Sequence, residues 1–336
     1  MKNIDQQKTK QYKGLDVGTM NLIGASDSEG NNIKVKTMRH VFLEVSESLF
    51  MKNTFKKQHV KYVEINGKIY LLGDSAFTIA KQMNTTVHRP MQAGILNNAE
   101  TVSEVLLNIM IESLIGRAKN KEDICCYSIP SDPIDADFNV LYHKGIIAQI
   151  LEFLGYTPIP LKEGLAVVFS ELADKDFTGL GFSFGGGMIN VCFAHEGKSV
   201  LDFSSIRGGD WIDRNVALNL GFQQSMITGK KETTTNIHNP HSSIDRAFRI
   251  YFSDVFQYIF KLIEKESRDK IKDRSLFSKG IDIACSGGSI LIPGFLELFK
   301  KEISKASLPF TVNDIRLVKA PLETTAKGCY MAATIN

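Results

Sequence analysis

The chain has 336 residues, of which 43% are hydrophobic and 23% are charged, and its formal net charge is +3. This length predicts two domains with a sizeable core, whereas the small net charge, without a basic run interleaved with aromatics, argues against direct nucleic-acid binding. No apolar stretch is long enough to span a bilayer, and the polar residues 1–13 are typical neither of a signal peptide nor of a membrane-binding helix.

The cysteines indicate the compartment. None forms a Cys-x-x-Cys pair, and none has a nearby His that would complete a zinc site, so we expect buried free thiols in a reducing cytoplasm. They are Cys125, Cys126, Cys192, Cys285 and Cys329.

The first element in chain order is an apolar strand, residues 14–17, followed by a turn and a second apolar run, residues 22–25. This pattern predicts a hairpin. A glycine in the turn lets the backbone approach a ligand, and the surrounding amides and hydroxyl can converge on an anion. Asp16 at the strand end could hold hydrated Mg²⁺, although most Asp-x-Gly turns are only turns. The candidate anion-binding residues are Gly18, Thr19, Met20 and Asn21.

Residues 26–117 continue with short strands and helices. Asn66-Gly67 between two apolar-alternating runs is a strong hairpin signal, and residues 40–90 are typical of a small insertion in a larger lobe. In chain order we expect strands at 33–37 and 40–45, a polar surface segment at 46–59, the hairpin at 60–72, a short helix from 73, a loop at 89–96 and a helix at 99–117.

Strands and helices then alternate up to residue 172. Such alternation predicts an α/β sheet flanked by helices. The expected elements are a strand at 123–130, a helix at 137–154, a strand at 157–161 and a helix at 163–172.

The second half of the chain repeats the opening hairpin. Apolar strands at 179–184 and 188–193 flank the turn Gly185-Gly186-Gly187. Two such hairpins facing each other would clamp one ligand between two related lobes. A triple glycine that stands alone is more often a bulge or a flexible turn.

A third glycine turn lies near the C-terminus. Gly287, Gly288 and Ser289 follow an apolar strand at 281–285, and bare backbone there would let a flat aromatic base lie against it. The intervening residues predict a helix beginning near 207–213, with Asp210 or Asp213 in its first turn. A loop-rich insertion at 223–243, a long helix at 244–269 and a final small-residue helix at 323–334 complete the expected elements.

Three glycine turns in this order, at residues 16–21, 185–187 and 287–289, each after an apolar strand, resemble the actin-like ATPase superfamily. The resemblance covers residues 12–334 and is greatest to the bacterial filament-forming actins. It implies an α/β fold of two lobes, each a ribonuclease-H-like unit, with a nucleotide cleft between them. The implied domains are lobe I at 12–165, lobe II at 166–322 with an insertion at 207–279, and a hinge helix at 323–334.

The same resemblance implies ATP in the cleft, Mg²⁺ on its phosphates, and head-to-tail homopolymers that a cargo or adaptor protein could bind. Glu163 takes the place of the carboxylate that orients the attacking water, unless it is only a helix-start glutamate stabilised by the helix dipole. Lys231 and Glu232 fall near the ribose-binding region, with a plain solvated pair as the alternative. Asp210 belongs to residues 207–213, which resemble the Gly-Gly-Asp-x-x-Asp segment shared by the chaperone and bacterial actin members of the superfamily.

One position departs from the family pattern. Ser183 stands where the second phosphate loop normally opens with Asp, and a hydroxyl cannot supply the charge that organises hydrated Mg²⁺. We therefore expect ATP binding with slow hydrolysis, reduced by about a hundredfold or more. The alternatives are a non-polymerising, chaperone-like ATP switch and a small-molecule kinase, and the kinase is disfavoured because no catalytic-base context or zinc-binding cysteine cluster is recognisable.

Overall fold

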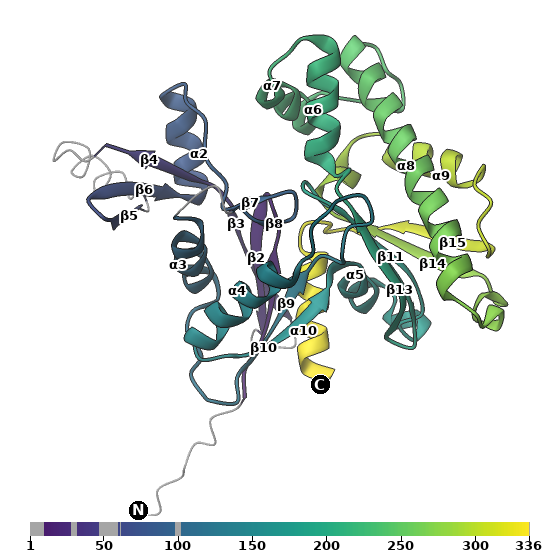
Figure 1. Cartoon of the computed structure of the whole chain (residues 1–336), viewed down its shortest axis with the longest axis horizontal. Coiled ribbons are helices and arrows are strands. Elements are labelled where there is room, and N and C mark those ends of the chain that lie inside the picture. The colour runs from purple at the N-terminus through teal and green to yellow at the C-terminus, as the bar shows by residue number, and fades with distance from the viewer. Residues whose placement is uncertain (1–9, 28–31, 47–59, 61, 98–101, 336) are drawn as a thin grey trace, which may run out of the picture.

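Two five-stranded sheets lie side by side in the computed structural model, with helices packed around each (Figure 1). The structure describes residues 10–27, 32–46, 60, 62–97 and 102–335. The predicted surface segment at 46–59, apart from residue 46, and the expected helix start at Ala99 lie outside these ranges. We call each sheet with the elements packed on it a lobe. Among the described residues, no helix combines the length and apolar character needed to cross a membrane.

Lobe I is built on the sheet β10-β9-β1-β2-β3. β1 and β2 are antiparallel, with Val17 opposite Leu22, while β9 and β10 run parallel to β1. Its elements are β1 (Tyr12–Val17), β2 (Asn21–Asp27), β3 (Ile33–Arg39), α3 (Ser103–Ile115), β9 (Ile124–Ile129), α4 (Leu141–Phe153) and β10 (Thr157–Lys162).

A small subdomain with its own core projects from lobe I, within the predicted insertion at 40–90. It consists of the sheet β4-β6-β5 and one helix, and the Asn66-Gly67 turn joins β5 to β6 as expected. Its elements are β4 (Phe42–Val45), β5 (Tyr62–Ile65), β6 (Lys68–Leu72) and α2 (Gly73–Gln82). The segment at 89–96, expected to be a loop, contains the two-residue strands β7 (Met91–Gln92) and β8 (Ile95–Leu96).

Lobe II has the sheet β13-β12-β11-β14-β15. Three antiparallel strands are followed by two parallel ones, so its order repeats that of lobe I and the predicted duplication is confirmed. Its elements are β11 (Gly179–Phe184), β12 (Ile189–His195), β13 (Lys198–Ser205), α6 (Gly209–Leu220), α7 (Gln224–Thr233), α8 (Ser243–Lys270), β14 (Ile281–Ser286), α9 (Phe295–Ile303) and β15 (Val312–Leu317), with short 3-10 turns at Ala173–Lys175, Arg274–Phe277 and Gly288–Leu291.

Phenylalanines form much of the core of lobe II. On α8 the buried Phe248, Phe252, Phe256 and Phe260 recur every fourth residue and therefore share one helix face. Ser242 and Asp245 close the start of this helix in a capping box. This face packs on α9 and the sheet, where the rings of Phe256 and Phe295 meet edge-on at 5.1 Å. Two of the predicted glycine turns extend from strands of the sheet on which these phenylalanines pack.

Two helices carry the chain between the lobes. α5 (Glu163–Glu171) follows the last strand of lobe I but packs on the sheet of lobe II, and α10 (Thr324–Ile335) follows lobe II but packs on the sheet of lobe I. The helices touch each other through Gly328, where a Cβ would overlap the Ala166 carbonyl. Close helix contacts of this kind need glycine or other small residues.

Three sequence predictions need correction. Residues 223–243 are not loop-rich throughout, because α7 occupies Gln224–Thr233, buries Ile227 and bonds to α6 through Thr228 and Lys231. α4 begins at Leu141, four residues later than expected, and the edge strand β15 was missed because its sequence, VNDIRL, contains no continuous apolar run. The five cysteines are buried and free, as predicted.

Candidate functional site

All of the predicted site residues line one cavity of about 810 Å³ between the two lobes. The turn after β1, the turn after β11 and the turn after β14 reach this cavity, although they are far apart in sequence. They bring together Asp16, Gly18, Thr19, Met20, Asn21, Glu163, Ser183, Gly185, Gly186, Gly187, Asp210, Lys231, Glu232, Gly287, Gly288 and Ser289. A cavity of this size is typical of small-molecule and cofactor sites.

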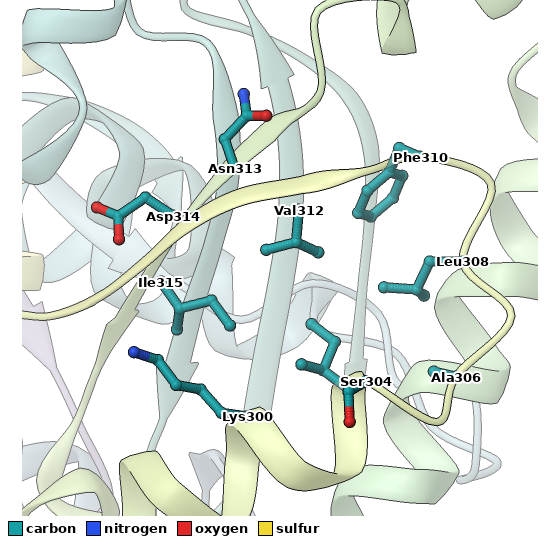
Figure 2. Close-up of a pocket in the computed structure, with 10 residues that line it drawn as sticks. Lys300, Ser304, Ala306, Leu308, Phe310, Val312, Asn313, Asp314 and Ile315 are labelled. Atoms are coloured by element: carbon teal, nitrogen blue, oxygen red, sulfur yellow. The ribbon is translucent and has the colours of Figure 1, made fainter.

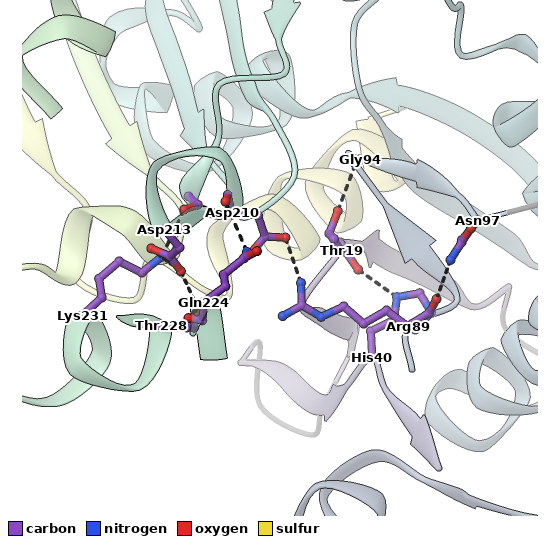
Figure 3. Close-up of polar contacts among 12 residues, drawn as sticks. Thr19, His40, Arg89, Gly94, Asn97, Asp210, Asp213, Gln224, Thr228 and Lys231 are labelled. Carbon is purple, nitrogen blue, oxygen red and sulfur yellow. Dashed lines mark hydrogen bonds and ion pairs between the residues drawn. The ribbon is translucent and has the colours of Figure 1, made fainter. Parts of the chain in front are cut away.

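The first turn is closed by a hydrogen bond from the Gly18 amide to the Asn21 carbonyl, at 3.1 Å. His40 also hydrogen-bonds to this turn, because its Nδ1 donates to the Gly18 carbonyl at 2.8 Å (Figure 3). Burial lowers the pKa of His40 to about 4, so the ring is neutral near pH 7 and Nδ1 carries the proton. Sequence reasoning missed this residue, because nothing local connects it with the turn.

The second turn has the same closure, with the Gly185 amide donating to the Met188 carbonyl at 3.0 Å. The start of α6 lies directly against it, because the amides of Gly209 and Asp210 donate to the carbonyls of Gly185 and Gly186. Gly208 is the N-cap of α6, and Asp210 lies in the first turn of this helix, as predicted. These bonds hold the Gly185–Gly187 turn against the start of α6.

The third turn exposes bare backbone to the cavity. Gly287 has φ +94°, and a Cβ there would overlap the Phe184 backbone, so the position requires glycine. A Cβ on Gly288 would meet only the Leu322 side chain, at 3.5 Å, so this residue faces open space. Leu291, Pro293 and other apolar side chains line the same part of the cavity, which suits a flat aromatic base.

Two carboxylates, Asp16 and Glu163, line the same cavity and interact electrostatically. Asp16 accepts a hydrogen bond from Ser128 Oγ at 2.8 Å, and neither it nor Glu163 pairs with a Lys or Arg among the described residues. Burial, with a smaller contribution from Asp16, raises the pKa of Glu163 to about 8. Burial also raises the pKa of Asp16 to about 6, opposed by the Ser128 bond. Two partly buried carboxylates without a cationic partner favour the approach of a cation.

Ser183, the position that departs from the family pattern, donates to Glu163 Oε2 at 2.9 Å. Asn190, opposite it on β12, donates to the same oxygen at 3.0 Å and accepts the Ser131 amide with its own carbonyl. Glu163 is thus held by side chains and is not a solvated helix-start residue. Its other oxygen remains available for a ligand or water.

Two of the predicted charged residues, Lys231 and Asp210, are held by partners that the sequence did not reveal. Lys231 Nζ pairs with the fully buried Asp213 carboxylate at 2.8 Å, and Asp210 pairs with Arg89 of lobe I at 2.8 Å (Figure 3). Glu232 lines the cavity with an exposed side chain. Lys231 is therefore not a plain solvated lysine, whereas Glu232 is exposed.

A second cavity, of about 420 Å³, lies between α9 and the edge strand β15 (Figure 2). Lys300, Leu308, Phe310 and Val312 are among the residues that line it. It contains none of the predicted site residues, and it does not reach the glycine turns.

The residues of the larger cavity fit a magnesium nucleotide. Glycine turns provide amides for phosphates, and the bare third turn accommodates a base. Among the described residues, no group of three or more His, Cys, Asp or Glu could form a metal centre by itself. Asp16 would therefore hold Mg²⁺ jointly with waters and phosphates, which is the usual arrangement for this ion.

Comparison with solved structures identifies the fold. MamK, in a double helical filament, is 16% identical with a TM-score of 0.67, covering 97% of this chain and 98% of that chain. MreB 5 of Spiroplasma citri bound to AMPPNP is 13% identical with a TM-score of 0.69 and coverages of 98% and 97%. The ethanolamine utilization protein EutJ from Carboxydothermus hydrogenoformans is 13% identical with a TM-score of 0.57 and coverages of 97% and 91%.

The predicted actin-like fold is thereby confirmed over nearly the whole chain. Comparison with curated proteins gives no match. The family model described as Volactin matches residues 12–333. The chain belongs to the Volactin family and has the two-lobed actin-like fold.

Proposed function

We propose that this protein is a cytoplasmic actin-like ATPase that binds ATP with Mg²⁺ between its lobes and polymerises head to tail. The observation that carries the proposal is that glycine turns from both lobes border one cavity, which also contains two unpaired carboxylates. Two proteins that share this fold support it, since MreB 5 was solved with bound AMPPNP and MamK was solved as a double helical filament.

In this proposal Gly18–Asn21 and Gly185–Gly187 hold the phosphates, and Gly287–Ser289 lie against the adenosine. ATP supplies a γ-phosphoryl group that water can attack, and positioning dominates such reactions. Glu163 orients that water through the oxygen that Ser183 and Asn190 leave free. The lobes correspond to residues 12–165 and 166–322, with 323–334 as the hinge helix.

In this proposal ATP hydrolysis is slow because Ser183, unlike the Asp normally found at this position in the family, brings no negative charge that would help to bind hydrated Mg²⁺. Its hydroxyl is already engaged by Glu163, at 2.9 Å. A nucleotide that bridges two lobes favours their closed arrangement to the extent that it binds that arrangement more tightly. The closed form would then expose the surfaces that join successive subunits, and a cargo or adaptor protein could bind the polymer.

Calorimetric titration with ATP and Mg²⁺ tests the nucleotide site. Gly288→Val fills the open part of the cavity with little overlap, so it should weaken ATP binding at least about tenfold without unfolding the protein. Gly145→Val, on α4 where a Cβ would have no atom within 4 Å, is the control and should bind like the wild type. Wild-type protein that does not bind ATP would refute the proposal.

Pelleting and electron microscopy with ATP, ADP and no nucleotide test polymerisation. Nucleotide-dependent filaments support the proposal. A protein that binds ATP yet stays monomeric in every state would instead be the non-polymerising, chaperone-like switch.

A further inference from the structure

The short hairpin formed by β7 and β8 extends from lobe I and lies between the first two glycine turns. The Gly94 amide donates to Thr19 Oγ1 of the first turn at 3.1 Å. A Cβ on Gly94 would lie 2.7 Å from Met188 Cγ, directly after the second turn, and a Cβ on Gly187 would overlap the Gly94 amide. The hairpin therefore touches both turns, and any change in their spacing must move it or break these contacts.

Arg89, just before this hairpin, forms an ion pair across the lobes. Its Nη1 lies 2.8 Å from Asp210 Oδ2 (Figure 3), with the side chains 31% and 26% exposed. Asp210 also lines the cavity, and its amide donates to the Gly186 carbonyl. A carboxylate in this place would repel an anionic ligand on the Gly185–Gly187 turn, and the cation from lobe I neutralises it.

Two other ion pairs join the lobes among the described residues, and neither borders the cavity. Lys162 pairs with Asp202, but Lys162 directly precedes α5, where the chain crosses between the sheets, so this pair lies at the pivot. Arg207 lies 4.0 Å from Asp135 and is shared with Asp254 inside lobe II. The Arg89 pair is thus the one placed to respond to opening of the cavity.

We propose that Arg89 and Asp210 form a latch between the lobes that holds the cavity closed and slows release of an anionic ligand. For the identity of that ligand, ATP, the inference rests on the proposed function. If binding needs the closed form, apparent affinity falls in proportion to the fraction of molecules that are closed. Breaking the latch lowers that fraction and speeds ligand release.

A charge-swap cycle tests the latch with the full chain. Arg89→Asp and Asp210→Arg each place like charges across the gap, whereas the double variant restores opposite charges in reversed order. Each single variant should open the lobes, and Arg89→Asp, which leaves the Asp210 carboxylate without its cation, should also weaken ATP binding about fivefold or more with faster dissociation. The double variant should recover much of the closed lobe separation. Reversing Glu112 and Arg117, an exposed pair at the end of α3, is the control and should change neither.

Lobe separation is measured by energy transfer between dyes on Met83→Cys and Leu218→Cys. These exposed positions lie at the end of α2 and on α6, on opposite lobes (Figure 1), and the native cysteines are buried. The measurement without nucleotide tests the latch even if ATP does not bind, which separates its failure from that of the proposed function. An unchanged distance in both single variants, or no recovery in the double variant, would overturn the latch.

Discussion

Glu163→Gln should raise the free energy of unfolding, and this gain should increase with pH, because the substitution removes a charge that burial disfavours. The folded state raises the pKa of Glu163 from 4.5 to about 8. Between these values the folded protein keeps a proton that the unfolded chain has released, so wild-type stability falls with increasing pH. One pKa unit is worth about 1.36 kcal/mol, and two pH units in this window give about 2 kcal/mol after allowing for simultaneous titration of Asp16.

Gln fits this site without other changes. Ser183 and Asn190 both donate to one oxygen of Glu163, and the amide oxygen of Gln can accept both bonds. The effect therefore reports the charge and not a lost contact.

Urea unfolding at about pH 5.5 and about pH 7.5, followed by the fluorescence of Trp211, the single tryptophan, measures this effect. The difference in unfolding free energy between Glu163→Gln and wild type should grow by about 2 kcal/mol between the two conditions. Glu297→Gln, at an exposed position on α9, is the matched control and should show no such growth. A difference that stays constant with pH would refute the reasoning.

Three further predictions follow from the site. Ser183→Asp should raise the rate of Mg²⁺-dependent phosphate release from ATP by up to about a hundredfold, whereas the uncharged Ser183→Asn should not. Equal rates in the two variants would contradict a role for negative charge at this position. Lys231→Ala leaves the buried Asp213 without its cation and should lower the free energy of unfolding, measured in urea, by about 3 kcal/mol. The control Lys230→Ala, at an exposed position on the same helix, should lower it by less than about 0.5 kcal/mol. Gly187→Ala should displace the Gly94 hairpin and weaken ATP binding about tenfold by calorimetry, whereas Gly229→Ala, with open space around it, should bind normally. Similar affinities for these two variants would argue against close packing at the turn.

Much of the fold was readable from local patterns. The Asn66-Gly67 turn and the glycine turns between apolar strands predicted the hairpins correctly, since two or three residues decide such turns. The helix α7 escaped prediction because it has one buried residue and is held by bonds to α6. The strand β15 escaped because an edge strand lacks the continuous apolar run of a central strand.

The candidate site was predictable in its glycines and carboxylates but not in its partners. His40 behind Gly18, Ser128 beside Asp16 and Arg89 opposite Asp210 each come from a distant part of the chain. A lone polar residue carries no local signal of such pairing, so only coordinates reveal it.

The sequence by itself determined where the backbone could turn tightly and which apolar runs became strands, because steric freedom at glycine and side-chain alternation act over a few residues. Tertiary structure decided the electrostatics. It brought Glu163 and Asp16 together in one cavity, where partial burial raises the pKa of both carboxylates, and it buried Asp213 against Lys231. Charge interactions depend on distance and burial, and these are set only when segments far apart in the chain pack together.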